Sequence, residues 1–249
     1  MKPADSWLFP FVGIALIELG AEIAGAQDVA FVTKSTLLPL LGVWFFSRLS
    51  GKIVPPFNGM LTVFAGSWLG DVSLMLAPTS DTDLTVLGVH KNAAWFLMGV
   101  AAFFVVHLRL IRIYRAVDRT DLPGPWTTNK LAFAPLVLYG AGLFTALIPG
   151  LMADPVKSTV VLPVTIYGTL LMTMVAFAIN RHGRVDPASF RLTLGGAAVF
   201  LLSDSLIGLT ILLPGGGLPL AGFWIMLTYL IAEFLIAAGI VRQLEAPLI

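Results

Sequence analysis

The chain of 249 residues contains no cysteine and only three histidines. Without cysteine there is no disulfide, no thiolate nucleophile and no thiolate metal ligand. The scarcity of histidine argues against a zinc-dependent membrane amidase, which needs several imidazole ligands. Charged residues are also few, at 12% of the chain, and the net charge is only +1. Bulk charge therefore indicates neither nucleic acid nor an acidic partner.

Apolar residues are abundant instead. They make up 57% of the chain, and the mean hydropathy is +0.91. Eight mainly apolar segments are long enough to cross a bilayer, at residues 7–25, 30–49, 59–78, 92–114, 130–151, 158–179, 191–213 and 217–241. The sequence therefore predicts an all-α, polytopic transmembrane bundle of eight spans, with residues 1–249 forming a single integral membrane domain.

The positive charges predict the orientation of these spans. Twelve of the fifteen lysines and arginines lie at the N-terminus, in the loops after even-numbered spans or in the span ends next to those loops, and at the C-terminus. The opposite side carries only Lys34, Lys91 and Lys157. By the positive-inside rule we expect both termini in the cytoplasm, and a multi-pass protein of the bacterial inner membrane. A seven-span chain without the first segment would keep this bias, so charge alone leaves that alternative open.

The first segment has some features of a cleaved signal peptide, since an apolar stretch follows Lys2 and ends near Ala24. Acidic residues interrupt it, however, at Asp5, Glu18 and Glu22. We therefore predict that it is a true span. The two glutamates lie one turn apart, and either line a cavity within the bundle or face a water-filled entrance.

Two aspartates lie deep inside apolar runs. Asp71 falls within residues 59–77 and Asp204 within residues 192–213. A charged residue at the centre of a span costs about 2.5–3.5 kcal/mol on insertion scales, and such residues usually mark chemistry or ion traffic. At about 1.5 Å per residue, each aspartate lies roughly 17–18 Å from the cytoplasmic boundary, near the midplane. The alternative is a structural role, in which each aspartate makes a separate interhelical hydrogen bond.

Other polar residues lie at comparable depths. Tyr167 falls in the outer half of its span, and Tyr229 and Glu233 lie one turn apart on the last span. We expect these side chains to converge on the same cavity as the two aspartates. Two interpretations of Lys34 are open. Its side chain either extends to the membrane interface, or it has a functional role and pairs with Asp71 or with a lipid phosphate.

One histidine lies within a span. His107 shares a helix face with Gly99 and Phe103, because the three are four residues apart. A lone histidine near a helix end is more often packed than catalytic. Gly195 and Gly196 predict close approach of a neighbouring helix and need no catalytic role.

Six motifs that carry these residues occur in a fixed order: TKSTLLPLLGVW, LGDVSLML, MGVAAFFVVHLRLIRIY, PVTIYGTLLMTM, GGAAVFLLSDSLIG and TYLIAEFLIAAG. In order and spacing they resemble the lysoplasmalogenase family, the YhhN-like integral membrane hydrolases. The resemblance covers about residues 30–240 and implies a bundle of eight helices. It also implies cleavage of the vinyl ether bond of alkenyl-lysophospholipids, giving a fatty aldehyde and a glycerophospho-base.

The resemblance also implies site residues. The paired aspartates proposed to be catalytic in the family match Asp71 and Asp204. The positions expected to bind substrate are Lys34, His107, Tyr167, Ser203, Tyr229 and Glu233. We expect a hydrolase that needs neither cofactor nor metal, with a lysophospholipid substrate and membrane lipids as its surroundings. The chain departs from the family at Ser35, where proline is common, and at Glu233, where glutamine is common.

The chemistry suits two carboxyl groups. Hydrolysis of a vinyl ether needs a proton delivered to carbon and a negative group beside the resulting cation. A carboxyl group in apolar surroundings near a second carboxylate keeps its proton at neutral pH, and its neighbour can stabilise the cation. Two other classes fit the same residues: a proton-coupled transporter, and a heptahelical-type lipid-binding protein without turnover.

Overall fold

The computed structural model describes residues 3–49, 56–76, 85–86, 89–116, 121–153, 157–212 and 218–245. Eight helices within these ranges are long and apolar enough to span a membrane, at Ala4–Ala24, Gln27–Arg48, Asn58–Leu76, Ala94–Ala116, Lys130–Met152, Val161–Asn180, Pro187–Thr210 and Ala221–Glu245. The all-α, eight-span prediction is confirmed. The protein is a multi-pass integral membrane protein. Positions 77–78, 213 and 217 of the predicted spans lie outside the described residues.

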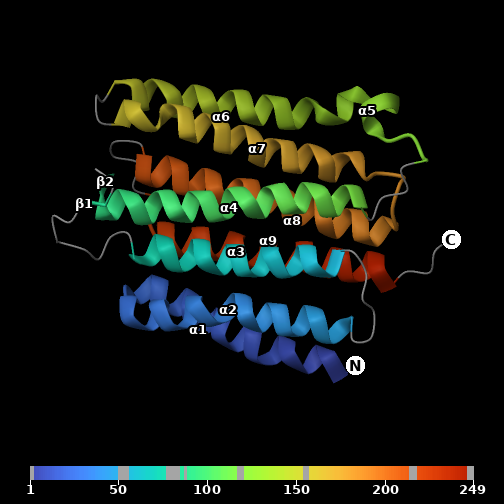
Figure 1. Cartoon of the computed structure of the whole chain (residues 1–249), viewed down its shortest axis with the longest axis horizontal. Coiled ribbons are helices and arrows are strands. Elements are labelled where there is room, and N and C mark those ends of the chain that lie inside the picture. The colour runs from blue at the N-terminus through green and yellow to red at the C-terminus, as the bar shows by residue number, and fades with distance from the viewer. Residues whose placement is uncertain are drawn as a thin grey trace. The chain divides into compact units, whose positions relative to one another are not determined.

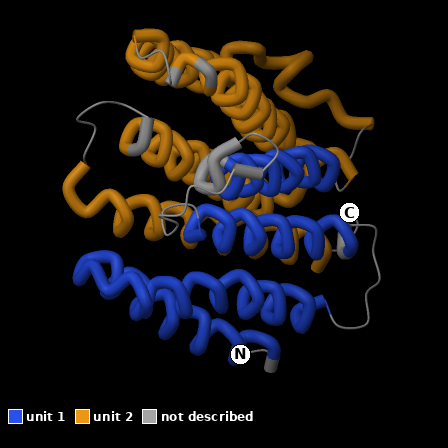
Figure 2. Tube along the Cα trace, turned by 60° about the vertical axis from the view of Figure 1, so that its left-hand side comes forward, with its two compact units in different colours: residues 1–113 blue, residues 114–249 orange. Residues whose placement is uncertain are grey.

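The chain forms two compact units, Met1–Ile113 and Tyr114–Ile249 (Figure 2). The prediction of a single membrane domain concerns how these units join, and it stays a prediction. Unit 1 contains the short 3-10 helix η1 (Pro3–Trp7) and the helices α1 (Leu8–Ala24), α2 (Gln27–Arg48) and α3 (Pro56–Leu76), followed by most of α4 (Lys91–Ala116). Two-residue strands, β1 (Thr85–Val86) and β2 (Val89–His90), pair antiparallel before α4.

Helices α1 and α2 form an antiparallel hairpin, which Figure 1 shows in blue. Gly25 ends α1 in the left-handed conformation, at φ 68°, where a residue with a side chain would be strained. Its backbone N–H donates a hydrogen bond to the carbonyl of Ala21. Helix α2 packs in turn against α3. Phe45, Phe46 and Phe64 form edge-to-face ring contacts at centroid distances of 5.3–6.1 Å.

Helix α3 packs closely on α4 because small residues face the contact. A Cβ on Gly66 would lie 2.8 Å from the side chain of Val106, and one on Gly70 would lie 2.5 Å from the ring of Phe103. A Cβ on Gly99 would lie 2.8 Å from Leu74. The face of α4 that carries Gly99 and Phe103 is therefore the face against α3.

Unit 2 contains the short helix α5 (Pro125–Thr128), the 3-10 helices η2 (Lys130–Phe133) and η3 (Lys157–Val160), and the long helices α6 (Ala134–Met152), α7 (Val161–Asn180), α8 (Pro187–Ile207) and α9 (Ala221–Glu245). A π-helical turn, η4 (Gly208–Leu212), extends α8. Sequence neighbours pack in pairs: α6 on α7, α7 on α8, and α8 along α9.

Buried polar side chains reinforce the packing of α8. The guanidinium of Arg181, at the end of α7, is fully buried, donates to the Thr193 hydroxyl at 2.8 Å, and lies 5.1 Å from the centre of the Tyr114 ring. The Ser189 hydroxyl donates to the carbonyl of Gly239 on α9 at 2.7 Å. These bonds satisfy polar groups that would be costly to bury alone.

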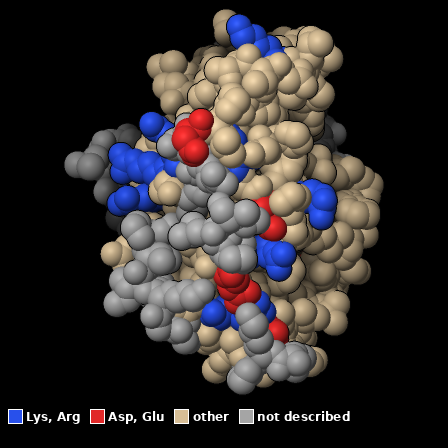
Figure 3. All heavy atoms as spheres, turned by 90° about the vertical axis from the view of Figure 1, so that its right-hand side faces the viewer, with Lys and Arg blue, Asp and Glu red and all other residues tan. Residues whose placement is uncertain are grey.

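Ion pairs lie near helix ends within each unit. Arg48 contacts Asp5 at 2.5 Å in unit 1, and Arg242 contacts Asp186 at 3.2 Å in unit 2. Figure 3 shows both basic and acidic side chains on one face of the molecule. Charge at the ends of apolar helices is expected where spans leave the bilayer.

Candidate functional site

Asp204 is held by a tyrosine. The hydroxyl of Tyr167 on α7 donates to Oδ2 of Asp204 on α8 at 2.5 Å. Both side chains are partly buried in apolar helices. The structure therefore brings together two of the predicted site residues from different spans. The hydrogen bond orients the Asp204 carboxyl group, and Oδ2 is the oxygen that carries this contact.

Ser203, the neighbour of Asp204, serves as a link to α9. Its side chain is 1% exposed and its hydroxyl donates to the carbonyl of Ile225 at 3.0 Å. This bond satisfies the hydroxyl inside the unit and ties the end of α8 to the start of α9. The predicted contact of Ser203 with substrate stays a prediction.

Tyr229 and Glu233 are both buried on α9, at 4% and 1% exposure. The Tyr229 ring packs edge-to-face on Phe200 at a centroid distance of 5.7 Å. Phe200 lies one helical turn before Asp204 on α8. Within unit 2, Tyr229 therefore contacts the helix that carries Asp204, one turn along from that residue.

Asp71 and His107 are buried in unit 1, at 7% and 0% exposure. Asp71 follows Gly70, which lies against the Phe103 ring of α4. His107 is one turn beyond Phe103, so periodicity places it on the α4 face that packs against α3. The sequence prediction that Gly99, Phe103 and His107 share a face is consistent with this packing.

Lys34 on α2 pairs with two glutamates of α1. Its Nζ lies 3.4 Å from Oε1 of Glu22 and 3.8 Å from Oε1 of Glu18. The Thr33 hydroxyl donates to Oε2 of Glu18, which is fully buried. Lys34 itself retains 18% exposure of its side chain. The lysine is therefore held within the protein by carboxylates rather than simply reaching for the interface.

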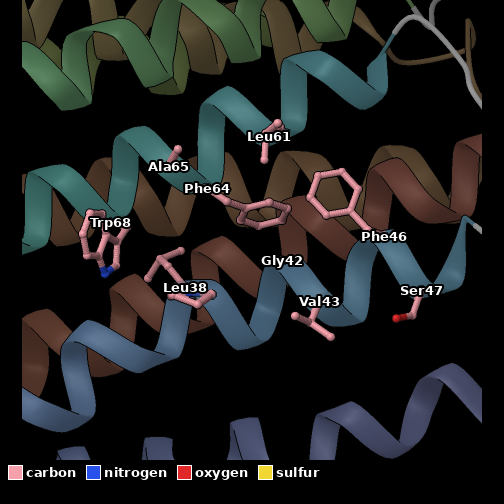
Figure 4. A pocket seen from close by; sticks show the side chains of 10 residues that line it. Leu38, Gly42, Val43, Phe46, Ser47, Leu61, Phe64, Ala65 and Trp68 are labelled. Carbon is pink, nitrogen blue, oxygen red and sulfur yellow. The ribbon is translucent and has the colours of Figure 1, made fainter.

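An apolar groove with a cavity volume of about 630 Å³ lies between α2 and α3, and its lining begins at Leu38, one helical turn along α2 from Lys34. Figure 4 shows Leu38 and Trp68 at one end, and Phe46 and Ser47 at the other. The Trp68 indole donates to the carbonyl of Ser35 at 2.8 Å, one residue from Lys34. Nothing in the residue pattern of a single helix shows a groove, because it forms only where two helices diverge.

The Glu18–Lys34 contact had a signal in the sequence. Glu18 lies eight residues before Ala26 and Lys34 lies eight residues after it. An antiparallel hairpin that turns near Ala26 places both at the same depth. The charges of the first span therefore predict a partner in the second.

Within the described ranges, no group of three or more histidine, aspartate or glutamate side chains is placed to hold a metal ion. The expectation of a metal-independent reaction stays a prediction.

The sequence matches a protein-family model. The model described as the YhhN family matches residues 29–240, which is most of the chain and begins after α1. No curated protein and no solved structure matches the chain. The family match spans the helices that carry all eight predicted site residues, and the chain belongs to the YhhN family.

Proposed function

We propose that the protein is a lysoplasmalogenase-like hydrolase that cleaves the vinyl ether bond of alkenyl-lysophospholipids in a bacterial inner membrane. The YhhN family is associated with hydrolase activity. The observation that carries the proposal is the presence, in a YhhN-family chain, of acidic side chains inside two apolar spans: the buried Asp71, and Asp204 held by Tyr167. Acids in such positions usually serve chemistry.

The proposed reaction consumes one water molecule. A carboxylic acid donates its proton to the vinyl carbon next to the ether-bearing carbon, and an oxocarbenium ion forms. Water adds to the ether-bearing carbon and loses a proton to a carboxylate. The hemiacetal hydroxyl then gives up its proton as the bond from carbon to the glycerol oxygen breaks, and the glycerol oxygen takes up a proton, so that no net proton is consumed. The products are a fatty aldehyde and a glycerophospho-base.

Asp71 and Asp204 are the residues that we propose for these two roles. One is the acid, and the other stabilises the cation and receives the proton from water, as paired carboxyl groups do in glycosidases. The Tyr167 hydroxyl keeps the Asp204 carboxyl group in one orientation. General acid catalysis contributes about 10²–10⁴-fold, so stabilisation of the cation must contribute as well.

Lys34 is proposed to bind the substrate phosphate. Glu22 lies 3.4 Å from Nζ of Lys34. This carboxylate holds the lysine in place, but it also competes with a substrate phosphate for the ammonium group. A substrate with a positive group in its head could engage Glu22 while its phosphate engages Lys34. If Lys34→Ala left the apparent substrate affinity unchanged, the phosphate role would be refuted.

The test is direct. Purified protein in lipid nanodiscs is incubated with an alkenyl-lysophospholipid, and free aldehyde is measured. We expect aldehyde release, and a fall of about 10²-fold or more in kcat for Asp71→Asn and for Asp204→Asn. Asp28→Asn, at an exposed position at the start of α2, is the matched control and should retain activity.

Three results would contradict the proposal. Full turnover in both variants would refute the site assignment even with the activity present. Uptake of solute into vesicles without aldehyde would favour a transporter, and retention of intact lysolipid would favour a lipid-binding protein.

A further inference from the structure

The groove between α2 and α3 extends from Leu38 to Ser47 on α2 and from Leu61 to Trp68 on α3. Its lining includes Leu38, Val43, Phe46, Leu61, Ala65 and Trp68 (Figure 4). Val43, Leu61 and Trp68 are 39–53% exposed, so the groove opens at the surface of the two helices. From Leu38 to Ser47 it extends nine residues, or about 14 Å along α2.

Two charged residues of the same helices lie beyond one end of the groove. Lys34 is one turn before Leu38 on α2, and Asp71 is three residues after Trp68 on α3. Figure 4 shows Leu38 and Trp68 together at this end, because α2 and α3 run antiparallel. Counted outward from this end, the apolar channel is followed by Asp71 after three residues and by Lys34, held between carboxylates, after four.

This order matches the order of groups in a single-chain amphiphile, which has a charged head, one linkage and one aliphatic chain. We propose that the groove holds the aliphatic chain of the lysolipid substrate, with the head at Lys34 and the first bonds of the chain beside Asp71. The identity of this lipid as a substrate rests on the function proposed above.

The size of the groove sets how much of the chain it holds. An extended chain advances roughly 1.3 Å per carbon, given a C–C bond of about 1.5 Å, so 14 Å accommodates roughly eleven carbons. A longer chain passes the inner end at Phe46 and Ser47. The groove therefore distinguishes chains shorter than about ten carbons, which leave it partly empty, from longer ones.

The groove acts on position more than on affinity. A chain that moves from bilayer lipid to an apolar groove gains no hydrophobic free energy, since lipid tails are as apolar as leucine. What it gains is a fixed line of approach, which holds the linkage at the depth of Asp71. We therefore expect a blocked groove to lower kcat more than it raises KM.

Ala65→Phe is the blocking variant, because Ala65 lines the groove and is exposed. Leu69→Trp is the control: Leu69 is 43% exposed on the same helix and is not among the lining residues. The measurement is kcat and KM for alkenyl-lysophospholipids of 8 and 18 carbons, in the same nanodiscs. We expect Ala65→Phe to lower the 18-to-8 ratio of kcat/KM about tenfold, mainly through kcat, and Leu69→Trp to leave the ratio unchanged.

A second measurement needs no turnover. A lysophosphatidylcholine with a diazirine near the tenth carbon is photolysed with the protein in phosphatidylcholine vesicles, where diacyl lipid is in large excess. We expect label at Phe46 and Leu61, reduced several-fold by Ala65→Phe and by unlabelled lysolipid. Label spread evenly over all apolar helices, or insensitive to Ala65→Phe, would overturn the inference.

The two measurements separate the two proposals. Groove labelling without aldehyde release would refute the proposed hydrolase while supporting a site for single-chain lipid. Aldehyde release with an unchanged chain-length ratio and scattered label would refute the groove and leave the hydrolase standing.

Discussion

Two acidic side chains inside the apolar helices, Asp204 and Glu18, accept hydrogen bonds from hydroxyl groups. Tyr167 donates to Asp204, and Thr33 donates to the buried Glu18. A carboxyl oxygen buried without a donor would cost several kcal/mol, so each hydroxyl offsets part of that cost and fixes the orientation of the acid. At the scale of single residues, these hydrogen bonds hold Asp204 and Glu18 in defined orientations.

The hydroxyl of Tyr167 should matter for turnover. We expect Tyr167→Phe to lower kcat/KM about 10–100-fold, because a hydrogen bond to a charged group contributes about 1.5–3 kcal/mol. Tyr139→Phe, at an exposed tyrosine of α6, is the control for the same chemical change. Aldehyde release from the alkenyl-lysophospholipid is the measurement. Equal activity in the two variants would show that the contact with Asp204 has no part in the reaction.

Asp186 illustrates a carboxylate with a structural role, in the turn before α8. It caps the helix by accepting the N–H of Ser189 at 2.9 Å, and it pairs with Arg242. The Ser189 hydrogen bond, helped by Arg242, lowers the pKa of Asp186 below its usual value. A lowered pKa in the folded state means that the charged form is stabilised by folding.

The pH dependence follows from that sign. The stabilisation is complete above the ordinary carboxyl pKa of about 3.9 and is lost as the pH falls through the lower folded value. We expect Asp186→Ala to destabilise the protein by about 1 kcal/mol at pH 7. The difference from the unmodified protein should shrink below about pH 4, as measured by thermal unfolding in detergent.

Asp186→Asn is the matched control, because asparagine keeps an oxygen that can cap the helix and removes only the charge. It should cost less than alanine at pH 7. A difference between the alanine variant and the unmodified protein that did not vary with pH would contradict an ionised cap.

Part of the site could be predicted from single residues. Asp71 and Asp204 stand out because charge is rare and costly within apolar runs. The depth of Tyr167 led us to expect it near the aspartates, but its hydrogen bond to Asp204 could not be predicted, because that bond depends on how α7 rotates against α8 and both helices are apolar on most faces. The pairing of Lys34 with Glu18 was accessible, since both are equidistant from the turn of one hairpin.

At the scale of elements, small residues set the closest helix contacts. On α8, a Cβ at Gly196 would lie 2.8 Å from the backbone nitrogen of Ile236 and 2.9 Å from the carbonyl oxygen of Ala232. These are backbone atoms of α9, which cannot move aside as a side-chain tip can. At Gly195 a Cβ would meet only the Leu235 side chain at 3.8 Å, an ordinary contact. The structure thus assigns the close approach to Gly196, not to both glycines.

The neighbouring glycines provide a matched pair. We expect Gly196→Ala to force α8 and α9 apart and to destabilise the protein by about 1–3 kcal/mol. Gly195→Ala should be neutral or slightly stabilising, because alanine is the better helix former. Thermal unfolding in detergent measures both, and a similar loss in the two variants would contradict the assigned contact.

The long elements were predictable, whereas the short ones were not. Hydropathy indicates each of the eight spans because a bilayer demands a run of about twenty apolar residues. It carries no signal for α5, where the backbone N–H of Trp126 donates to Oδ1 of Asn180 at 3.0 Å and the Trp126 ring packs on Phe177. Nor does it indicate the π-helical turn η4 after Asp204, which changes the geometry of α8 without changing its apolar character.

At the scale of the whole molecule, the orientation of the spans decides from which side of the membrane a lysolipid reaches the groove. Twelve positive charges against three predict cytoplasmic termini. The same orientation places the Lys34 end of the proposed chain groove toward the outer side, because α2 would begin there. The direction from which a lysolipid approaches therefore depends on the topology.

The lack of cysteine makes this topology directly measurable, since a single introduced thiol has no background. Thr128 lies between α4 and α6 and Ala153 lies after α6, both exposed. With a membrane-impermeant maleimide on intact spheroplasts, we expect Ala153→Cys to be labelled at once. Thr128→Cys should be labelled only after permeabilisation. The reverse pattern would invert the predicted orientation.

Ser6→Cys extends the same experiment to the first span. Ser6 precedes α1 and is exposed, and an eight-span protein with a cytoplasmic N-terminus protects it in intact spheroplasts. If Ser6→Cys were labelled from outside while Thr128→Cys stayed protected, α1 would not cross the membrane. Because Asp5 pairs with Arg48 at the far end of the same hairpin, that result would also contradict the packing of α1 along α2 that brings Glu18 and Glu22 to Lys34.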